Sequence, residues 1–262
     1  MAKGRLTRPA SFDGGELRAL PVLSIREVFP GDSVANLIVD ALALRGLRFH
    51  AGDILVVKHK IVSKAEGRTV VLDTVKPSSA AKRFAAGNGV DARVVELALL
   101  EATRVVRKKH VLITENRQGL VCANSGVDVS NVDGGKTAAL LPADADRSAA
   151  TIHRALEQRT GLYIPVIIAD SFGRAWRDGL CEVAIGVAGM KVIHNYRGRR
   201  DPYGYKIHAT EEAVVDELAC VAGLVCGKDS RIPACIIRGY AYRRGKGSAR
   251  QLVRPPEKDL FR

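Results

Sequence analysis

The polar segment 124–131 directly follows an apolar stretch and carries four side chains with ligand oxygens: Asn124, Asp128, Ser130 and Asn131. Hard cations such as Mg2+ and Mn2+ prefer oxygen ligands, and a Mg2+ ion that accompanies a nucleotide usually takes one or two carboxylates. Asp128 fits such a role. Asp and Asn also form ordinary turns and helix caps, so this segment alone leaves a purely structural turn open.

A second carboxylate, Asp170, stands at the end of the apolar run 162–169. Ser171 adds a hydroxyl ligand next to it, and Arg174 and Arg177 follow closely. If both polar segments meet, two carboxylates for a metal ion and guanidinium groups for a phosphate lie in one site. Asp128, Asp170 and Arg174 are therefore the candidate catalytic residues. An ordinary strand-end Asp that pairs with Arg174 is the alternative.

The segment 58–68 gathers three lysines and one arginine around a predicted strand end. Lys64 is suited to hold a phosphate group as a compact point charge. A solvated basic turn would have the same composition, so the segment needs support from elsewhere in the chain. His59 carries less weight, because a lone histidine is more often structural than catalytic.

Common nucleotide-binding and hydrolase signatures are missing from the sequence. It contains no Gly-x-x-x-x-Gly-Lys-Ser/Thr phosphate loop, and no Gly-x-Gly-x-x-Gly fingerprint follows a predicted strand. Gly-x-Ser-x-Gly and His-Glu-x-x-His are absent as well, which disfavours serine hydrolases and zincins. The polar segments need a less common explanation.

The net charge predicts anionic partners. Lys and Arg total 41 against 28 Asp and Glu, a formal charge of +13. Such a field attracts nucleotides, acidic small molecules and nucleic acid alike. A basic nucleic-acid-binding protein is the less favoured class, because only 5% of the residues are aromatic and no known binding module is present.

The composition predicts a globular protein of the cytoplasm. The 262 residues are 47% hydrophobic and 26% charged, within the ordinary globular range. The apolar runs fall far short of the roughly 20 residues that cross a bilayer, and no signal-peptide core follows the basic start, so no membrane association is expected. Five scattered cysteines without a Cys-x-x-Cys pair predict neither disulfides nor structural zinc.

The elements that must position these residues are read from periodicity and turn signals. Residues 1–18 lack periodicity and are predicted to be a flexible arm, followed by one domain over 19–262. Strands are predicted at 20–25, 53–58, 61–63, 111–115, 119–123, 162–169, 183–188, 191–196 and 233–238. Helices are predicted at 33–47, 79–87, 91–103, 146–159 and 210–226, with loops or turns at 104–110, 124–132 and 170–174. The predicted helix starts include an N-cap at 31–33, Asp91, a cap at either Asp146 or Ser148, and Thr210. The fold class is α+β, with mixed sheets and packed helices in a single compact unit.

Several motifs then match one family in the same order along the chain. They cover 20–23, 30–32, 61–68, 122–132, 141–146, 170–177, 184–186, 213–219 and 252–262. In these motifs the chain resembles the coenzyme F-420-0:L-glutamate ligases, the gamma-glutamyl ligases of the deazaflavin coenzyme. The resemblance covers about residues 20 to 262, and so many colinear motifs rarely coincide by chance.

The resemblance implies a GTP-dependent reaction in coenzyme F-420 biosynthesis. A carboxylate of the lactyl-phospho-deazaflavin F-420-0 attacks the γ-phosphate, and the amine of L-glutamate captures the resulting acyl phosphate. Mg2+ or Mn2+, as two ions, with K+ as a further candidate, and a homodimer are implied too. By position, the implied metal ligands are Asp128, Asp170 and Ser171. The implied GTP contacts are Leu20, Pro21, Val22, Leu23, His59, Lys60, Lys64, Asn131, Gly227 and Lys228.

One departure from the family pattern concerns the second metal ion. Archaeal relatives place an oxygen ligand at the position of Lys228, and a protonated lysine cannot ligate a cation. Either the second ion is held differently, or Lys228 itself contacts phosphate. A family member with the same nucleotide chemistry and another acidic acceptor matches the sequence equally well.

Overall fold

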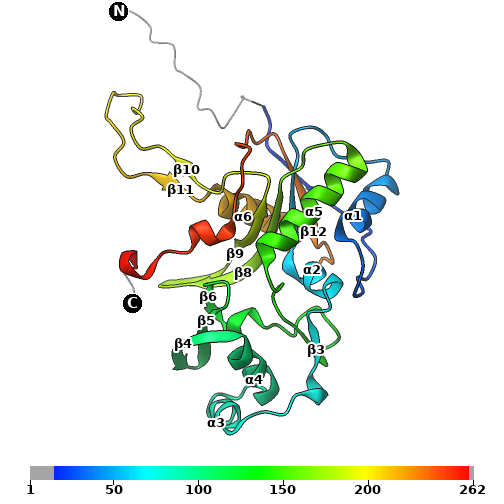
Figure 1. Ribbon diagram of the computed structural model, residues 1–262, viewed down its shortest axis with the longest axis vertical. Coiled ribbons are helices and arrows are strands. Elements are labelled where there is room, and N and C mark those ends of the chain that lie inside the picture. The colour runs from blue at the N-terminus through cyan, green and yellow to red at the C-terminus, as the bar shows by residue number, and fades with distance from the viewer. Residues whose placement is uncertain (1–14, 260–262) are drawn as a thin grey trace, which may run out of the picture.

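The computed structural model describes residues 15–259 and builds them around one five-stranded sheet (Figure 1). The strand order is β1 (Arg18–Pro21), β12 (Ala234–Arg238), β2 (Ile54–Lys58), β8 (Val166–Arg174) and β9 (Arg177–Ala188). β2 and β8 run parallel, whereas the other neighbours are antiparallel. Residues 54–57 of β2 and 166–169 of β8 are apolar and buried because both faces of the sheet are covered there.

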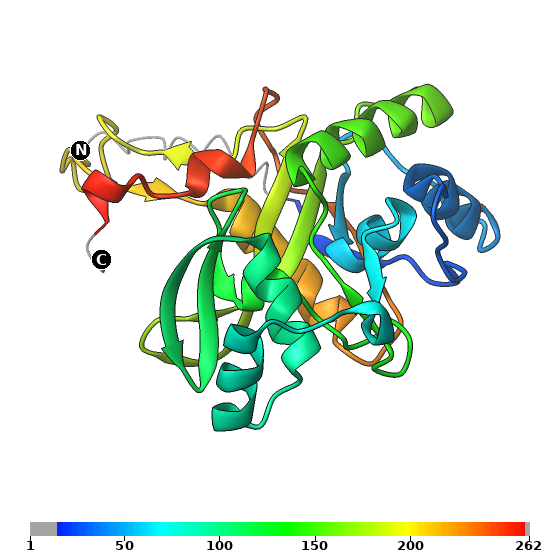
Figure 2. The same cartoon turned by 60° about the horizontal axis from the view of Figure 1, so that its bottom comes forward.

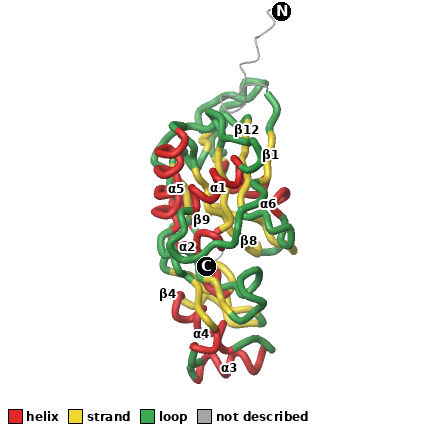
Figure 3. Tube along the Cα trace, turned by 90° about the vertical axis from the view of Figure 1, so that its right-hand side faces the viewer, coloured by secondary structure: helices red, strands yellow, loops and turns green. Residues whose placement is uncertain are grey.

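Helices cover the two faces of this sheet. On one face lie α1 (Val34–Ala43), α2 (His59–Ala65) and α5 (Ala145–Thr160), and on the other lies α6 (Val214–Cys226) (Figures 1 and 3). Leu55 and Val57 of β2 join the first core, while Ile54 and Val56 join the second. This alternation follows from the two-residue period of a strand.

A smaller lobe, residues 69–139, lies beside one end of the large sheet (Figures 1 and 2). It contains β3 (Thr69–Val71), α3 (Ser79–Asn88), α4 (Ala92–Glu101), β4 (Ala102–Lys109), β5 (Val111–Asn116), β6 (Val121–Ala123) and β7 (Thr137–Ala139). β4, β5 and β6 form one sheet, and β3 pairs with β7. The lobe has its own hydrophobic core, built from both helices and these strands.

The remaining elements are short. β10 (His194–Asn195) and β11 (Glu211–Glu212) pair at the base of an extension that projects from the body (Figure 1). Single 3-10 turns lie at Leu72–Thr74, Asn124–Gly126, Ala249–Leu252 and Pro256–Lys258. Within residues 15–259, no helix is long and apolar enough to span a bilayer. Arg18 belongs to β1, and residues 1–14 of the predicted arm lie outside the described part.

The mixed α+β class is confirmed, and two predicted caps are confirmed as well. The side chain of Ser33 caps α1 by accepting from the backbone N–H of Asn36, and Asp91 caps α4. The predicted cap of α5, Asp146 or Ser148, was wrong, because Asp144 caps that helix. α6 was predicted from Thr210 but begins at Val214, and only 194–195 of the predicted strand 191–196 are paired.

Three further segments differ from their predictions. Residues 61–63, predicted as a strand, lie in α2, whose apolar side packs under α1 and α5. The predicted turn 104–110 is mostly β4, an edge strand whose exposed basic side chains discourage further pairing. Residues 170–174 continue β8 rather than forming a loop, because β9 extends back to Arg177 and pairs with them.

A close approach between β9 and α5 gives a test of this packing. A Cβ at Gly186 would lie 2.2 Å from the carbonyl oxygen of Ala145, and backbone cannot move aside as a flexible side chain can. We expect Gly186→Ala to lower the free energy of unfolding in urea by about 1–3 kcal/mol or more. Gly87→Ala in α3 is the matched control, because its Cβ meets nothing within 4 Å and a helical alanine is favoured by up to about 1 kcal/mol. Equal stability of the Gly186 variant and the wild type would contradict the packing.

Candidate active site

A cleft of about 580 Å³ opens where β2 and β8 end. In the parallel register, Lys58 lies opposite Ala169. His59 begins α2 directly after β2, and beside it Asp170 and Ser171 continue β8 beyond the end of β2. The cleft is lined by residues from five segments: 25–28, 58–64, 131–134, 170–171 and 226–233.

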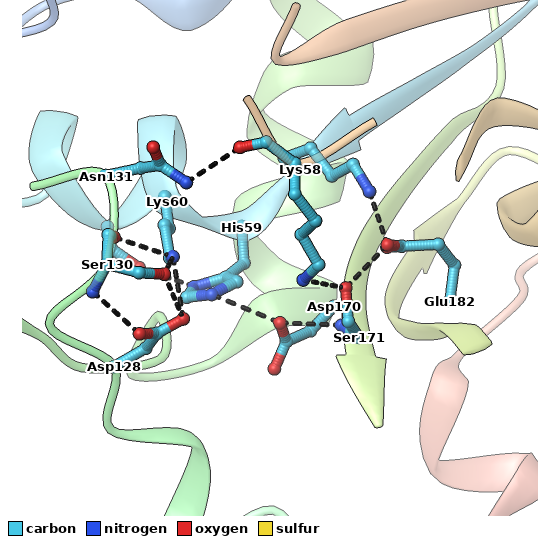
Figure 4. A network of polar contacts seen from close by, with 11 residues as sticks. Lys58, His59, Lys60, Asp128, Ser130, Asn131, Asp170, Ser171 and Glu182 are labelled. Atoms are coloured by element: carbon cyan, nitrogen blue, oxygen red, sulfur yellow. Dashed lines mark hydrogen bonds and ion pairs between the residues drawn. The ribbon is translucent and has the colours of Figure 1, made fainter. Parts of the chain in front are cut away.

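Asp128 of the small lobe is held by Lys60 of the large one (Figure 4). Lys60 Nζ donates to Asp128 Oδ2 at 2.7 Å and to the carbonyl and hydroxyl oxygens of Ser130, each at 2.8 Å. The backbone N–H of Ser130 donates to Asp128 Oδ1 at 2.8 Å. Burial would raise the pKa of Asp128, but these donors outweigh it and hold the pKa below its ordinary value. The carboxylate is charged at neutral pH.

Asp170 lies on the other side of His59 (Figure 4). Its Oδ1 accepts from the backbone N–H of Ser171 at 2.7 Å and lies 3.3 Å from His59 Nε2. The second is a close contact without hydrogen-bond geometry, since His59 Nε2 is buried without a hydrogen-bond partner among residues 15–259. Burial would raise the pKa of Asp170, yet the charge of His59 and the Ser171 N–H hold it below its ordinary value.

The buried carboxylate of Glu182 contacts Lys58 directly and Lys228 through the hydroxyl of Ser171. The Oγ of Ser171 donates to Glu182 Oε1 at 2.6 Å and accepts from Lys228 Nζ at 2.5 Å, while Lys58 Nζ pairs with the same Glu182 oxygen (Figure 4). Glu182 is 8% exposed, and a Cβ at Gly223 of α6 would lie 2.5 Å from its Cγ. The glycine thus leaves room for the carboxylate between sheet and helix.

The rim of the cleft carries further charges. Lys64 Nζ pairs with Glu27 Oε1 at 2.5 Å, and Arg26 and Arg231 line the same wall. Asn131 Nδ2 donates to the carbonyl oxygen of Lys228 at 2.9 Å, which ties the small lobe to the loop after α6. Basic side chains thus come from several separate segments and converge on one hollow, an arrangement suited to a polyanion.

The thiols near the cleft are poor nucleophiles. Burial raises the pKa of Cys226, which lines the cleft, to about 11. Burial and the nearby charge of Asp170 raise the pKa of Cys122 to about 12. Both are protonated at neutral pH, so neither favours covalent catalysis through sulfur.

Comparison with known proteins identifies the family of the chain. The family model described as F420-0:Gamma-glutamyl ligase matches residues 22–239. The chain belongs to this family. The protein named Coenzyme F420:L-glutamate ligase from Methanothermobacter thermautotrophicus is 45% identical over 236 residues, which are 88% of this chain and 93% of the relative. Its namesake from Methanopyrus kandleri is 43% identical over 252 residues, covering 94% and 98%.

Most residues that the gamma-glutamyl ligase resemblance singles out meet at the cleft. It is lined by His59, Lys60, Lys64, Asn131, Asp170, Ser171, Gly227 and Lys228. Asp128 joins them through Lys60. Arg174 does not join them, because it is exposed at the far end of β8 and donates to the carbonyl oxygen of Asp178 at 3.1 Å.

The predicted GTP segment 20–23 also lies apart from the lining. Leu20 and Pro21 pair with β12, and Val22 is fully buried in the core. Residues 25–28, which follow it directly, line the cleft instead. In this structure the N-terminal strand therefore supports the wall rather than forming it.

Sequence reasoning missed two acids of the site, Glu27 and Glu182. A charged residue at the start of the apolar run 183–188 was the only signal for Glu182. Its importance depends on the hairpin register, which places it directly opposite Ser171. Lys58 was noticed only as part of a basic segment, although its side chain lines the cleft.

The donor set suits a hard cation in this gamma-glutamyl ligase. Within residues 15–259, no three His, Cys, Asp or Glu side chains form a ready-made metal cage. Asp128, Asp170 and Ser171 offer oxygens alone, as Mg2+ or Mn2+ require, and a nucleotide would supply the remaining ligands. Ammonium groups of Lys60 and Lys228 contact the Asp128 carboxylate and the Ser171 hydroxyl. Metal binding stays a prediction.

The depressed pKa of Asp170 predicts how its contribution to stability changes with pH. A carboxylate whose folded-state pKa lies below its unfolded value stabilises the fold above the unfolded pKa of about 3.9 and loses this effect as pH falls through the folded pKa. In urea unfolding without added metal, we expect Asp170→Asn to be less stable than the wild type at pH 7. The difference in the free energy of unfolding between the two proteins should shrink once the pH falls below about 4. A difference in the free energy of unfolding that stays constant below about pH 4 would contradict a stabilising role of the Asp170 charge in its contacts with His59 and the Ser171 N–H.

Proposed function

We propose that this chain is a GTP-dependent ligase that joins L-glutamate to the deazaflavin precursor F-420-0 through an amide bond, in coenzyme F-420 biosynthesis. The observation that carries the proposal is the cleft itself, where Lys60, Lys64 and Lys228 converge beside two ionised aspartates. Membership of the F420-0:gamma-glutamyl ligase family and the names of the relatives indicate the substrates.

The residues of the cleft suit transfer of a phosphoryl group. Lys60, Lys64 and Lys228 would bind the triphosphate, and Asp128, Asp170 and Ser171 would hold Mg2+ or Mn2+. The bound cation would neutralise charge that develops on the phosphates. In this proposal an acceptor carboxylate attacks the γ-phosphate, GDP leaves, and the glutamate amine displaces phosphate from the acyl phosphate. The chain itself then needs no covalent nucleophile, in keeping with the protonated thiols.

A second candidate keeps this chemistry and changes the acceptor to another acidic molecule. The cleft geometry suits both, whereas the description of the family favours F-420-0. Binding of nucleic acid has no comparable support, because the basic groups that converge do so in a hollow rather than along a stripe. The homodimer, a K+ ion and a cytoplasmic location remain predictions from the resemblance and the sequence.

Heavy-oxygen labelling tests the route through the acyl phosphate. With both oxygens of the acceptor carboxylate labelled, we expect one labelled atom in the released phosphate, because the oxygen that attacks phosphorus stays with it. Mass spectrometry of the phosphate and of the product measures this transfer. Unlabelled acceptor in labelled water is the control and should give unlabelled phosphate. Product formation without label in the phosphate would exclude the acyl-phosphate route.

Lys64→Ala tests whether the basic wall contacts the triphosphate. Lys64 is only 13% exposed and faces the cleft from α2, with Glu27 as its partner in the free protein. We expect the variant to raise the KM for GTP or lower kcat by about tenfold or more, the loss of one charge-assisted hydrogen bond of roughly 1.5–3 kcal/mol. Lys206→Ala, an exposed lysine on the projecting extension, is the control. If both variants showed identical GTP kinetics, Lys64 would not contact the triphosphate and its role would be purely structural.

A further inference from the structure

The hydroxyl of Ser171 presents its lone pairs to an ammonium group. Its proton is given to Glu182 Oε1 at 2.6 Å, so its oxygen acts only as an acceptor toward the cleft. Lys228 Nζ donates to that oxygen at 2.5 Å. A hydroxyl oxygen with free lone pairs could also ligate a metal ion, but here the ammonium group of Lys228 occupies the place that such an ion would take.

The charges around Ser171 are unfavourable for a metal ion. Glu182 is the carboxylate that contacts this hydroxyl, and it already neutralises Lys58. Lys228 adds a second ammonium group at the same place. A divalent ion bound there would meet two ammonium groups, and an ammonium group has no lone pair with which to ligate it. Of the two carboxylates near Ser171, Glu182 already pairs with Lys58, and Asp170 also faces His59.

Asp128 and Asp170 offer a different balance of positive and negative charge. Asp128 and Asp170 are separate carboxylates, and the contacts of Asp170 Oδ1 are the Ser171 backbone N–H and the His59 ring rather than an ammonium group. Lys60 reaches Asp128 from an α2 position whose side chain also lines the cleft, so a bound phosphate could take over that ammonium group. The Asp128–Asp170 side is therefore the better place for a divalent ion.

We infer that this enzyme takes a single divalent ion with its nucleotide, on the Asp128–Asp170 side, and that the ammonium group of Lys228 replaces a second ion by contacting the triphosphate directly. The inference rests on the proposed function, since it needs a nucleoside triphosphate in the cleft. It differs from the two ions that the family resemblance implies, and the reason is the contact between Lys228 and Ser171.

Counting bound ions tests this inference without turnover. The full chain is saturated with Mn2+ and a non-hydrolysable GTP analogue, freed of excess ligand by rapid gel filtration, and assayed for manganese and nucleotide. We expect one Mn2+ per bound nucleotide in the wild type and two in Lys228→Glu, which puts an oxygen donor where the ammonium group was. Lys206→Glu, an equal charge reversal on the exposed extension, should keep one.

A metal-free measurement gives the second arm of the experiment. In buffer with a chelator, Lys228→Glu should lose affinity for the analogue by about tenfold or more, whereas Lys206→Glu should stay within about twofold of the wild type. Two Mn2+ in the wild type, or one in Lys228→Glu, would overturn the inference and leave the proposed function standing. A wild type that binds no analogue at all, with or without Mn2+, would overturn both.

Discussion

The parallel pairing of β2 with β8 is the constraint on which the site depends. Its register sets Lys58 opposite Ala169, so that the basic start of α2 lies beside Asp170 and Ser171 in the part of β8 that extends past β2. Neither strand could shift by one residue without turning its buried side chains to the wrong face, because each face of the sheet has its own core. The apolar packing of the sheet therefore fixes the position of charged groups that contribute little to that packing themselves.

Each carboxylate of the site has a cationic partner from another segment. Lys60 crosses from the large body to Asp128 in the small lobe, and Lys58 crosses from β2 to Glu182 in β9. The side chains of Lys58, Lys60 and Glu182 are mostly buried, and such charges are costly to leave unpaired, so the pairs hold the cleft in one arrangement before any ligand arrives. The same pairs keep the basic side chains extended along the wall instead of dispersed in solvent.

Sequence patterns located the elements of the site better than its contacts. The apolar run before Asp170 indicated a strand, and the capping residues Ser33 and Asp91 marked two helix starts, because these signals are local. Ile61 and Val62 suggested a strand since β-branched residues favour one, but the core under α1 and α5 accepts them from a helix. Arg174 was grouped with Asp170 by closeness in sequence, whereas a strand carries it about 13 Å along the sheet at roughly 3.3 Å per residue. Glu182 could not be found without the hairpin register, which no local pattern contains.

The pair between Lys60 and Asp128 also explains why a nucleotide and a metal ion would bind this cleft more tightly together than separately. An anion alone could attract Lys60 only by leaving Asp128 unpaired, and a cation alone could take Asp128 only by leaving Lys60 unpaired. Either exchange loses the partner of a partly buried charge. A triphosphate that carries its own divalent ion supplies an anion for the lysine and a cation for the aspartate in one step, so every charge keeps a partner. Because Asp128 belongs to the small lobe and Lys60 to the large body, such a ligand would replace a direct link between the two with a bridge through itself.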